Sequence, residues 1–220
     1  AQLSHDIKTP ITSIQATVEG ILDGVIEEEE QIHYLTTISR QTERLNKLVE
    51  ELDVLTLNAQ PRIESDGEAE IVFLDQLLIE VMSEFQLLIE QEERDIYIQV
   101  SPESAKIKSH YDKLSRILVN LLNNAFKYSD PGTKIEVVAQ LTEQILTISV
   151  KDEGQGIAPE DLDKIFKRLY RVETSRNMKT GGHGLGLAIA RELAHQLGGE
   201  ITVESQCGLG STFTFALNLT

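Results

Sequence analysis

Residues 113–128 read KLSRILVNLLNNAFKY, a stretch whose apolar and polar positions separate at helical spacing. Its polar positions include Asn120, Asn124 and Lys127, which are four and three residues apart and therefore share one face of a helix. Amide oxygens are hard ligands that suit Mg²⁺, and a lysine can reach a phosphate as a point charge. Taken alone, the pattern also fits a polar helix face that ends in the turn at residues 129–132.

A carboxylate and two glycines follow the strand predicted at residues 145–152, where the sequence reads DEGQGI over residues 152–157. Glycines at such a position let a flat ligand approach the backbone closely. A carboxylate only accepts hydrogen bonds, so Asp152 favours the exocyclic amine of adenine over the carbonyl oxygen that guanine presents there. In isolation, Asp-x-Gly at a strand end is also an ordinary turn.

The glycine-rich stretch GGHGLGL, residues 181–187, opens the helix predicted at 185–197. Backbone N–H groups at a helix N-terminus attract phosphate, and glycines leave them accessible. The stretch is neither a Walker motif nor a dinucleotide fingerprint, because no Gly-x4-Gly-Lys-Ser/Thr occurs and no βαβ unit surrounds it. The His-Arg-Asp and Asp-Phe-Gly motifs of protein kinases are also absent from the sequence.

Charge is distributed unevenly along the chain. The net charge of −16 argues against nucleic acid or an anionic membrane surface as a partner. Residues 164–179 nevertheless carry six Lys or Arg against one Glu, directly before the glycines. This excess predicts a lid over a polyanion at residues 172–182, with a loop that balances acidic neighbours as the alternative.

The first 58 residues predict a helical hairpin. Apolar residues recur every three or four positions from Leu3 to Val25 and from Ile32 to Leu55, and Gly24 lies between the two series. Two such helices cannot bury both stripes alone, so we expect a two-fold dimer that forms a four-helix bundle. Residues 59–70 are polar and predict a linker.

Residues 71–220 have a mixed pattern. Helices are predicted at 74–93, 113–128 and 185–197. Strands are predicted at 71–73, 96–100, 134–141, 145–152, 200–205 and 211–219. Antiparallel pairs of strands with helices between them indicate an α+β layered sandwich.

The single cysteine, Cys207, excludes an intramolecular disulfide and favours a reducing compartment. No apolar run approaches the length of a membrane span. The sequence starts abruptly in a helical pattern, from which we expect a fragment of a longer protein.

A further polar group lies in the first predicted helix. His5 and Thr9 are four residues apart and share one face, and Asp6 is close enough to orient the imidazole. Pro10 predicts a kink just after the histidine. An imidazole beside a carboxylate can act as a nucleophile, although a surface histidine next to a solvated charge is the simpler interpretation.

Taken together and in this order, the motifs resemble those of bacterial two-component sensor histidine kinases. SHDIKTP at residues 4–10 resembles the phosphoacceptor box, and NLLNNAFKYS at residues 120–129 the asparagine box. Residues 152–157 and 182–187 resemble the two glycine boxes, 165–171 the phenylalanine box, and 208–213 the last glycine turn. The resemblance covers nearly the whole chain.

The resemblance implies a fold, an activity and partners. Residues 1–58 would form the dimerisation and phosphotransfer domain, and residues 71–220 an ATP-binding domain with the Bergerat-type sandwich. His5 would take the γ-phosphoryl group of ATP and pass it to an aspartate of a response regulator. Asp6 would act as base or orienter, and Thr9 would position water for a phosphatase reaction. The core would be the cytoplasmic portion of a bacterial membrane receptor.

The same resemblance implies the nucleotide site. Asn124 would be the main Mg²⁺ ligand, Asp152 would hold the adenine amine, and Asn120 and Lys127 would lie near the metal and the phosphates. Asp6 and Leu169 depart from the commoner Glu and aromatic residue at their positions. The other implied nucleotide-binding residues are Tyr128, Gly154, Gly156, Ile157, Tyr170, Arg171, Gly182, His183, Gly184, Leu185 and Gly186.

Two alternatives remain at this point. One is a Bergerat ATPase whose hydrolysis drives a conformational change, and the other is a non-catalytic dimer that only docks a partner. The stimulus, the cognate regulator and the choice between phosphorylation within or across the dimer do not follow from the sequence.

Overall fold

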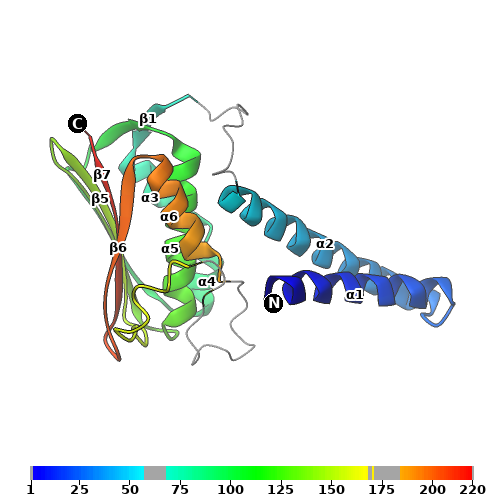
Figure 1. The fold of residues 1–220 in the computed structure, drawn as a ribbon. Helices are drawn as coiled ribbons and strands as arrows, with labels where there is room; N and C mark the ends of the chain where they lie inside the picture. Colours follow the sequence, from blue (N-terminus) through cyan, green and yellow to red (C-terminus); the bar gives the residue numbers. More distant parts are fainter. Residues whose placement is uncertain (1, 57–67, 168–169, 171–183, 220) are drawn as a thin grey trace. The chain divides into compact units, whose positions relative to one another are not determined.

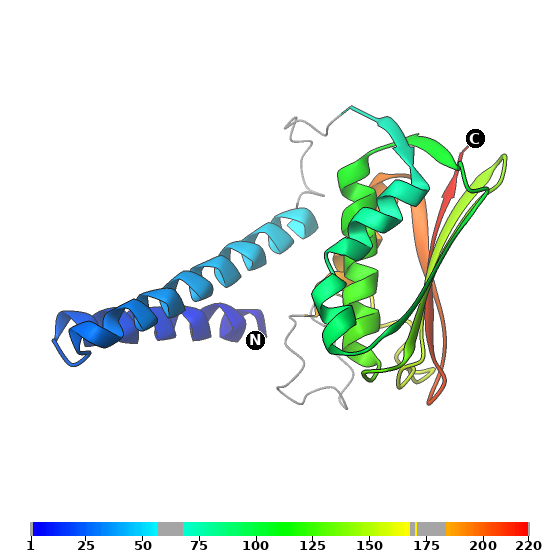
Figure 2. The same ribbon diagram turned by 180° about the vertical axis from the view of Figure 1, so that it is seen from behind.

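The computed structural model describes residues 2–56, 68–167, 170 and 184–219. The chain folds as two compact units, residues 1–60 and 61–220. Figures 1 and 2 show a helical hairpin in the first unit and a sheet with helices in the second. Among the described residues, no helix is long and apolar enough to span a bilayer.

The hairpin consists of α1 (Gln2–Leu22) and α2 (Glu28–Thr56), as the apolar spacing predicts. Gly24 lies in the turn with a φ of +68°, in the left-handed region that glycine adopts readily after a helix. The N–H groups of Val25 and Ile26 both donate to the carbonyl oxygen of Gly20, at 3.0 and 3.1 Å. The end of α1 is therefore closed by the backbone of the turn.

Apolar side chains of the hairpin remain exposed in the single chain. Val25 and Ile32 keep 78% and 76% of their surface exposed, although both belong to the apolar series of the sequence. The predicted dimer interface would cover such side chains. Among the described side chains of the hairpin, the exposed large apolar residues are Ile11, Val18, Leu22, Val25, Ile32, Leu35 and Val49.

The second unit is built on a five-stranded sheet in the order β2-β4-β5-β7-β6. The strands are β2 (Asp95–Ser101), β4 (Lys134–Leu141), β5 (Ile145–Asp152), β6 (Gly199–Gln206) and β7 (Gly210–Asn218). β2 and β4 are parallel, and the other neighbours are antiparallel. β1 (Glu70–Phe73) and β3 (Lys106–Ser109) form a separate antiparallel pair.

Helices cover one face of this sheet, as both views show (Figures 1 and 2). They are α3 (Leu74–Ser83), α4 (Gln86–Gln91), α5 (Tyr111–Tyr128) and α6 (Gly186–Gln196). This arrangement confirms the predicted layered sandwich. The core between the layers includes Leu114, Ile117, Leu118, Leu121 and Leu122 of α5, Ile135 and Val137 of β4, Leu146, Ile148 and Val150 of β5, and Phe213 and Phe215 of β7.

Three details differ from the sequence prediction. The helix expected over 74–93 is two helices, because the chain turns at Phe85, whose buried ring stacks on Phe126 of α5 at a centroid distance of 5.1 Å. The short strand β3 was not predicted, because it is only four residues long and two of them are exposed lysines, a residue type depleted in strands. β2 is parallel to β4, because β3 and α5 lie in the long connection between them.

Replacing Leu121 by alanine tests the role of α5 in this core. Leu121 is fully buried, so Leu121→Ala should lower the free energy of unfolding of the second unit by about 2–5 kcal/mol. Urea unfolding followed by tyrosine near-UV circular dichroism measures it, because four of the five tyrosines lie in residues 61–220.

The matched control is Leu209→Ala, since Leu209 is 66% exposed and should change the free energy by no more than about 0.5 kcal/mol. Equal unfolding curves for the two variants would contradict the placement of α5 in the core.

Candidate functional site

The site begins on α5, whose apolar stripe faces the core and whose asparagines remain partly accessible. Asn120, Asn124 and Lys127 are half-buried on this helix, as their spacing predicts. Asn120 Nδ2 donates to the carbonyl oxygen of Arg116 at 2.8 Å. Within the described residues, the Asn124 side chain makes no hydrogen bond, so its amide oxygen can serve as a ligand for a hard cation such as Mg²⁺.

The start of α6 approaches this face of α5. A Cβ atom added to Gly186 would lie 2.9 Å from Asn120 Oδ1, so glycine permits the contact between the two helices. Leu185, just before the helix, is buried, and Gly184 has a φ of +71°. The last glycines of the predicted phosphate loop therefore lie beside the asparagine face, at the N-terminus of a helix.

Asp152 ends β5 and is only 2% exposed. Its Oδ1 atom accepts a hydrogen bond from the Gly154 N–H at 2.8 Å. Burial raises the pKa of Asp152 above its usual range, while hydrogen bonds from the backbone of Gly154 and Ser211 and the charge of Arg94 act in the opposite direction. A carboxylate held in this way is suited to accept a hydrogen bond from a buried amine.

The loop after Asp152 packs tightly on the end of α5. The Gln155 N–H donates to the carbonyl oxygen of Tyr128 at 3.2 Å. A Cβ atom on Gly154 would lie 2.1 Å from that same oxygen, so only glycine fits. Tyr128 therefore contacts the site through its backbone, and the Lys127 ammonium lies 5.0 Å from the centroid of its ring.

The other side of the loop contacts the turn between β6 and β7. Gly156 has a φ of +70°, and a Cβ atom there would lie 2.1 Å from the carbonyl oxygen of Gln206. The Ile157 N–H donates to Ser205 Oγ at 2.8 Å. Sequence reasoning missed Ser205 and Gln206, because their partner lies about fifty residues earlier and only the glycine pattern hints at a close approach.

The phenylalanine-box segment is anchored on the sheet and on α6. Phe166 meets Phe213 of β7 edge-to-face at a centroid distance of 6.2 Å, and the Arg191 guanidinium lies 5.2 Å from the Phe166 ring centroid. The Tyr170 hydroxyl donates to Asp161 Oδ1 at 2.5 Å. Arg171, Gly182 and His183, and with them the predicted lid, lie outside the described residues.

The predicted phosphoacceptor residues lie on the other unit. His5, Asp6 and Thr9 all belong to α1, and Thr9 is exposed. Pro10 is buried inside α1, which extends on both sides of it. The side chains of His5 and Asp6 are outside the described part of the chain. In that part no group of three His, Cys, Asp or Glu residues could hold a metal ion.

Comparison with known protein families assigns both units. Residues 109–220 match the histidine kinase-, DNA gyrase B- and HSP90-like ATPase family. Residues 1–60 match the His Kinase A (phospho-acceptor) domain. The ATPase match covers α5, the Asp152 loop and α6, which are the elements that build the site.

Individual relatives agree with these matches. The histidine protein kinase SaeS of Staphylococcus epidermidis is 39% identical over 219 residues, which is 98% of this chain and 61% of that protein. The chain thus spans about three fifths of this relative. The solved structure of the Acinetobacter baumannii histidine kinase AdeS superposes with a TM-score of 0.76 and 28% identity, over 98% of both chains.

A more distant solved structure supports the fold alone. The histidine kinase ThkA, in complex with the response regulator protein TrrA, superposes with a TM-score of 0.72 and 23% identity, over all of this chain and 60% of that one.

With a phospho-acceptor domain at residues 1–60 and an ATPase domain at residues 109–220, the chain belongs to the histidine kinases, as its motifs predicted.

Proposed function

We propose that this chain is an ATP-dependent sensor histidine kinase core that phosphorylates its own His5 and passes the phosphoryl group to an aspartate of a response regulator. The observation that carries the proposal is the buried Asp152 carboxylate, whose loop packs on the end of the helix that bears Asn120 and Asn124, in a chain that also has a phospho-acceptor domain. ThkA was solved in complex with the response regulator protein TrrA, and a partner of the same kind is part of the proposal for this chain.

The nucleotide would lie between α5 and the Asp152 loop. Asp152 accepts a hydrogen bond from the adenine amine, and Gly154 and Gly156 let the loop that carries this carboxylate pack closely on Tyr128 and Gln206. The phosphates extend toward the start of α6 and Lys127, where N–H groups and the ammonium meet their charge. Tyr170, whose hydroxyl is bonded to Asp161, would stand at the start of the lid, and Arg171, Gly182 and His183 would complete the nucleotide site.

The face of α5 that carries the asparagines also accounts for the proposed requirement for Mg²⁺. Asn124 would hold Mg²⁺ through its amide oxygen, with Asn120 nearby and phosphate oxygens completing the shell. When bound, the ion neutralises charge that develops on the phosphates. Neutral amides suit this position, since the triphosphate already supplies negative charge.

The transfer itself needs few protein groups. An imidazole nitrogen of His5 attacks the γ-phosphorus, the bond to the β–γ bridging oxygen breaks, and ADP leaves with that electron pair. Asp6 orients the ring and takes its proton. In the next step a receiver aspartate takes the phosphoryl group from the histidine, and Thr9 positions water for the opposing phosphatase reaction.

The assembly and location are part of the proposal. The exposed apolar residues of α1 and α2 support a homodimer through residues 1–58. We place the core on the cytoplasmic side of a bacterial membrane receptor, with residues 59–70 as the linker that lets the ATP-binding domain reach His5. The acidic net charge is consistent with the absence of nucleic acid among its partners.

Labelling with γ-labelled ATP tests the phosphoacceptor. The wild-type protein should acquire label that is acid-labile and alkali-stable, because phosphoramidates hydrolyse in acid. His5→Gln should abolish it, whereas His33→Gln, a matched change on α2, should leave it intact. Phosphate release without protein label would indicate an ATPase instead, and absence of nucleotide binding would indicate a docking scaffold.

Replacing Asn124 tests the metal ligand. Asn124→Ala should remove most of the gain in ATP affinity and autophosphorylation that Mg²⁺ gives over EDTA, because the amide ligand is lost. Asn123→Ala is the control, since Asn123 is exposed on the neighbouring position of α5. An unchanged response to Mg²⁺ in Asn124→Ala would rule out this ligand.

The pH dependence of ADP binding tests Asp152. Because burial raises its pKa, affinity should fall as the pH drops through that raised pKa and the carboxylate becomes protonated. Asp152→Asn should bind ADP about tenfold or more weakly at neutral pH. It should also lose the acid limb of the binding profile, that is, the fall in ADP affinity at acidic pH.

Calorimetry on both proteins measures these effects, with Asp163→Asn, an exposed acid, as the control. The phosphates of ADP titrate alike in all three experiments. Identical acid limbs in wild type and Asp152→Asn would show that Asp152 does not hold the nucleotide.

A further inference from the structure

Arg94 is a buried cation that the nucleotide chemistry described above does not use. It lies between α4 and the start of β2, and its side chain has no exposed surface. Its guanidinium forms an ion pair with Glu92 Oε2 at 2.7 Å and lies 5.4 Å from the centroid of the Phe126 ring. A buried charge requires compensation of this kind, because removal from water is costly.

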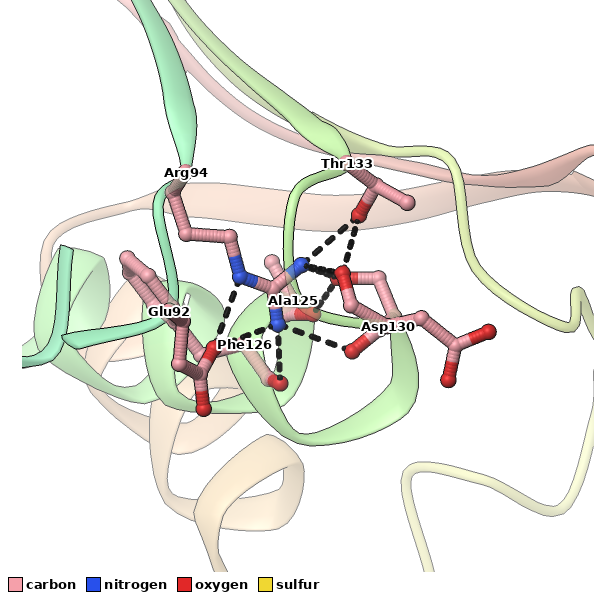
Figure 3. Close-up of polar contacts among 7 residues, drawn as sticks. Glu92, Arg94, Ala125, Phe126, Asp130 and Thr133 are labelled. Carbon is pink, nitrogen blue, oxygen red and sulfur yellow. Dashed lines mark hydrogen bonds and ion pairs between the residues drawn. The ribbon is translucent and has the colours of Figure 1, made fainter. Parts of the chain in front are cut away.

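Most of its hydrogen bonds go to the C-terminal end of α5 and the turn that follows (Figure 3). The guanidinium donates to the carbonyl oxygens of Phe126 at 3.1 Å and of Ser129 at 2.8 Å, and also to that of Asp130. It further donates to Ser129 Oγ at 2.8 Å and Thr133 Oγ1 at 2.7 Å. A positive charge at this end of a helix also suits the helix dipole.

The C-terminal end of α5, which Arg94 contacts, also supports the loop at residues 152–157. Tyr128 lies between the Arg94 contacts on Phe126 and Ser129, and its carbonyl oxygen accepts the Gln155 N–H at 3.2 Å. The same oxygen leaves no room for a Cβ atom on Gly154, whose N–H is bonded to Asp152. A continuous series of contacts thus joins Arg94 to the Asp152 carboxylate.

Arg94 also acts on Asp152 through its charge. In the described part of the chain it is the charged group whose field favours the ionised form of Asp152, and this field lowers the pKa that burial raises. Glu92, at 25% side-chain exposure, is paired with the guanidinium and offsets part of that field. The side chain of Asp130 is exposed, so water screens it.

We propose that Arg94 is a positioning residue for the nucleotide: it holds the end of α5 in place against the 152–157 loop, and so keeps the Asp152 carboxylate correctly placed for the adenine amine. This inference rests on the proposed ATP-binding function. It adds a residue from a segment that precedes the matched ATPase region, residues 109–220.

Three substitutions distinguish the hydrogen bonds that Arg94 makes to the end of α5 from the effect of its positive charge on Asp152. Arg94→Met removes both, so ADP affinity should fall about tenfold at neutral pH and the acid limb of binding should move to higher pH. Arg94→Lys keeps the charge without the planar fork, so affinity should fall while the acid limb stays near that of the wild type. Glu92→Gln removes the offsetting carboxylate, so the acid limb should move to lower pH.

Calorimetric titration of ADP from neutral to acidic pH measures all three, with folding checked by circular dichroism. Lys106→Met is the matched control, because the Lys106 ammonium also lies over an aromatic ring, that of Phe73 at 5.6 Å, but is exposed on β3. Its affinity and acid limb should match the wild type. If Arg94→Met does not fold, Arg94→Lys and Glu92→Gln carry the test.

The outcomes distinguish this inference from the proposed function. Absence of ADP binding by the wild-type protein would refute the proposed function itself. Wild-type binding with unchanged affinity in Arg94→Lys, or an acid limb that moves in neither Arg94→Met nor Glu92→Gln, would overturn the role of Arg94 and leave the proposed function intact.

Discussion

The packing of α5 on the sheet is the contact on which the rest of the second unit depends. One side of this helix buries an apolar stripe toward the sheet, where it contacts β5, and this fixes the rotation of the helix about its axis. With the rotation fixed, Asn120, Asn124 and Lys127 lie on the half-buried side of the helix, and Asn120 lies beside the start of α6. The hydrophobic core therefore sets the geometry of the polar site.

The second constraint is the burial of a carboxylate at the end of β5. Asp152 is costly to ionise where it lies, and backbone N–H groups together with one distant cation offset that cost. The glycines around Asp152 permit this burial. A Cβ atom on Gly154 or Gly210 would collide with the neighbouring backbone, so only glycine lets the chain pack this closely around the carboxylate. The Asp152 carboxylate is thus a hydrogen-bond acceptor shielded from water and held in one position. Such an acceptor can discriminate the exocyclic amine of adenine from the carbonyl oxygen of guanine.

The periodic parts of this protein could be predicted from the sequence, and the parts built by distant contacts could not. The helices α1, α2, α5 and α6, most of the strands and the placement of Asn124 and Asp152 all follow from local spacing. Arg94 escaped notice because its partners on the α5 turn lie 32 to 39 residues further along the chain, with no local pattern to mark them. The break at Phe85 likewise depends on a ring that belongs to α5.

A histidine kinase core divides its chemistry between a helix that carries the acceptor and a domain that holds the nucleotide, and the division into residues 1–60 and 61–220 matches this. The claim that the second unit holds ATP between α5 and the 152–157 loop is tested most directly by a crystal structure with Mg²⁺ and a non-hydrolysable ATP analogue. We expect the adenine amine within hydrogen-bond distance of Asp152 and the ion on Asn124. An analogue bound elsewhere, with the Asp152 carboxylate free of it, would contradict the account.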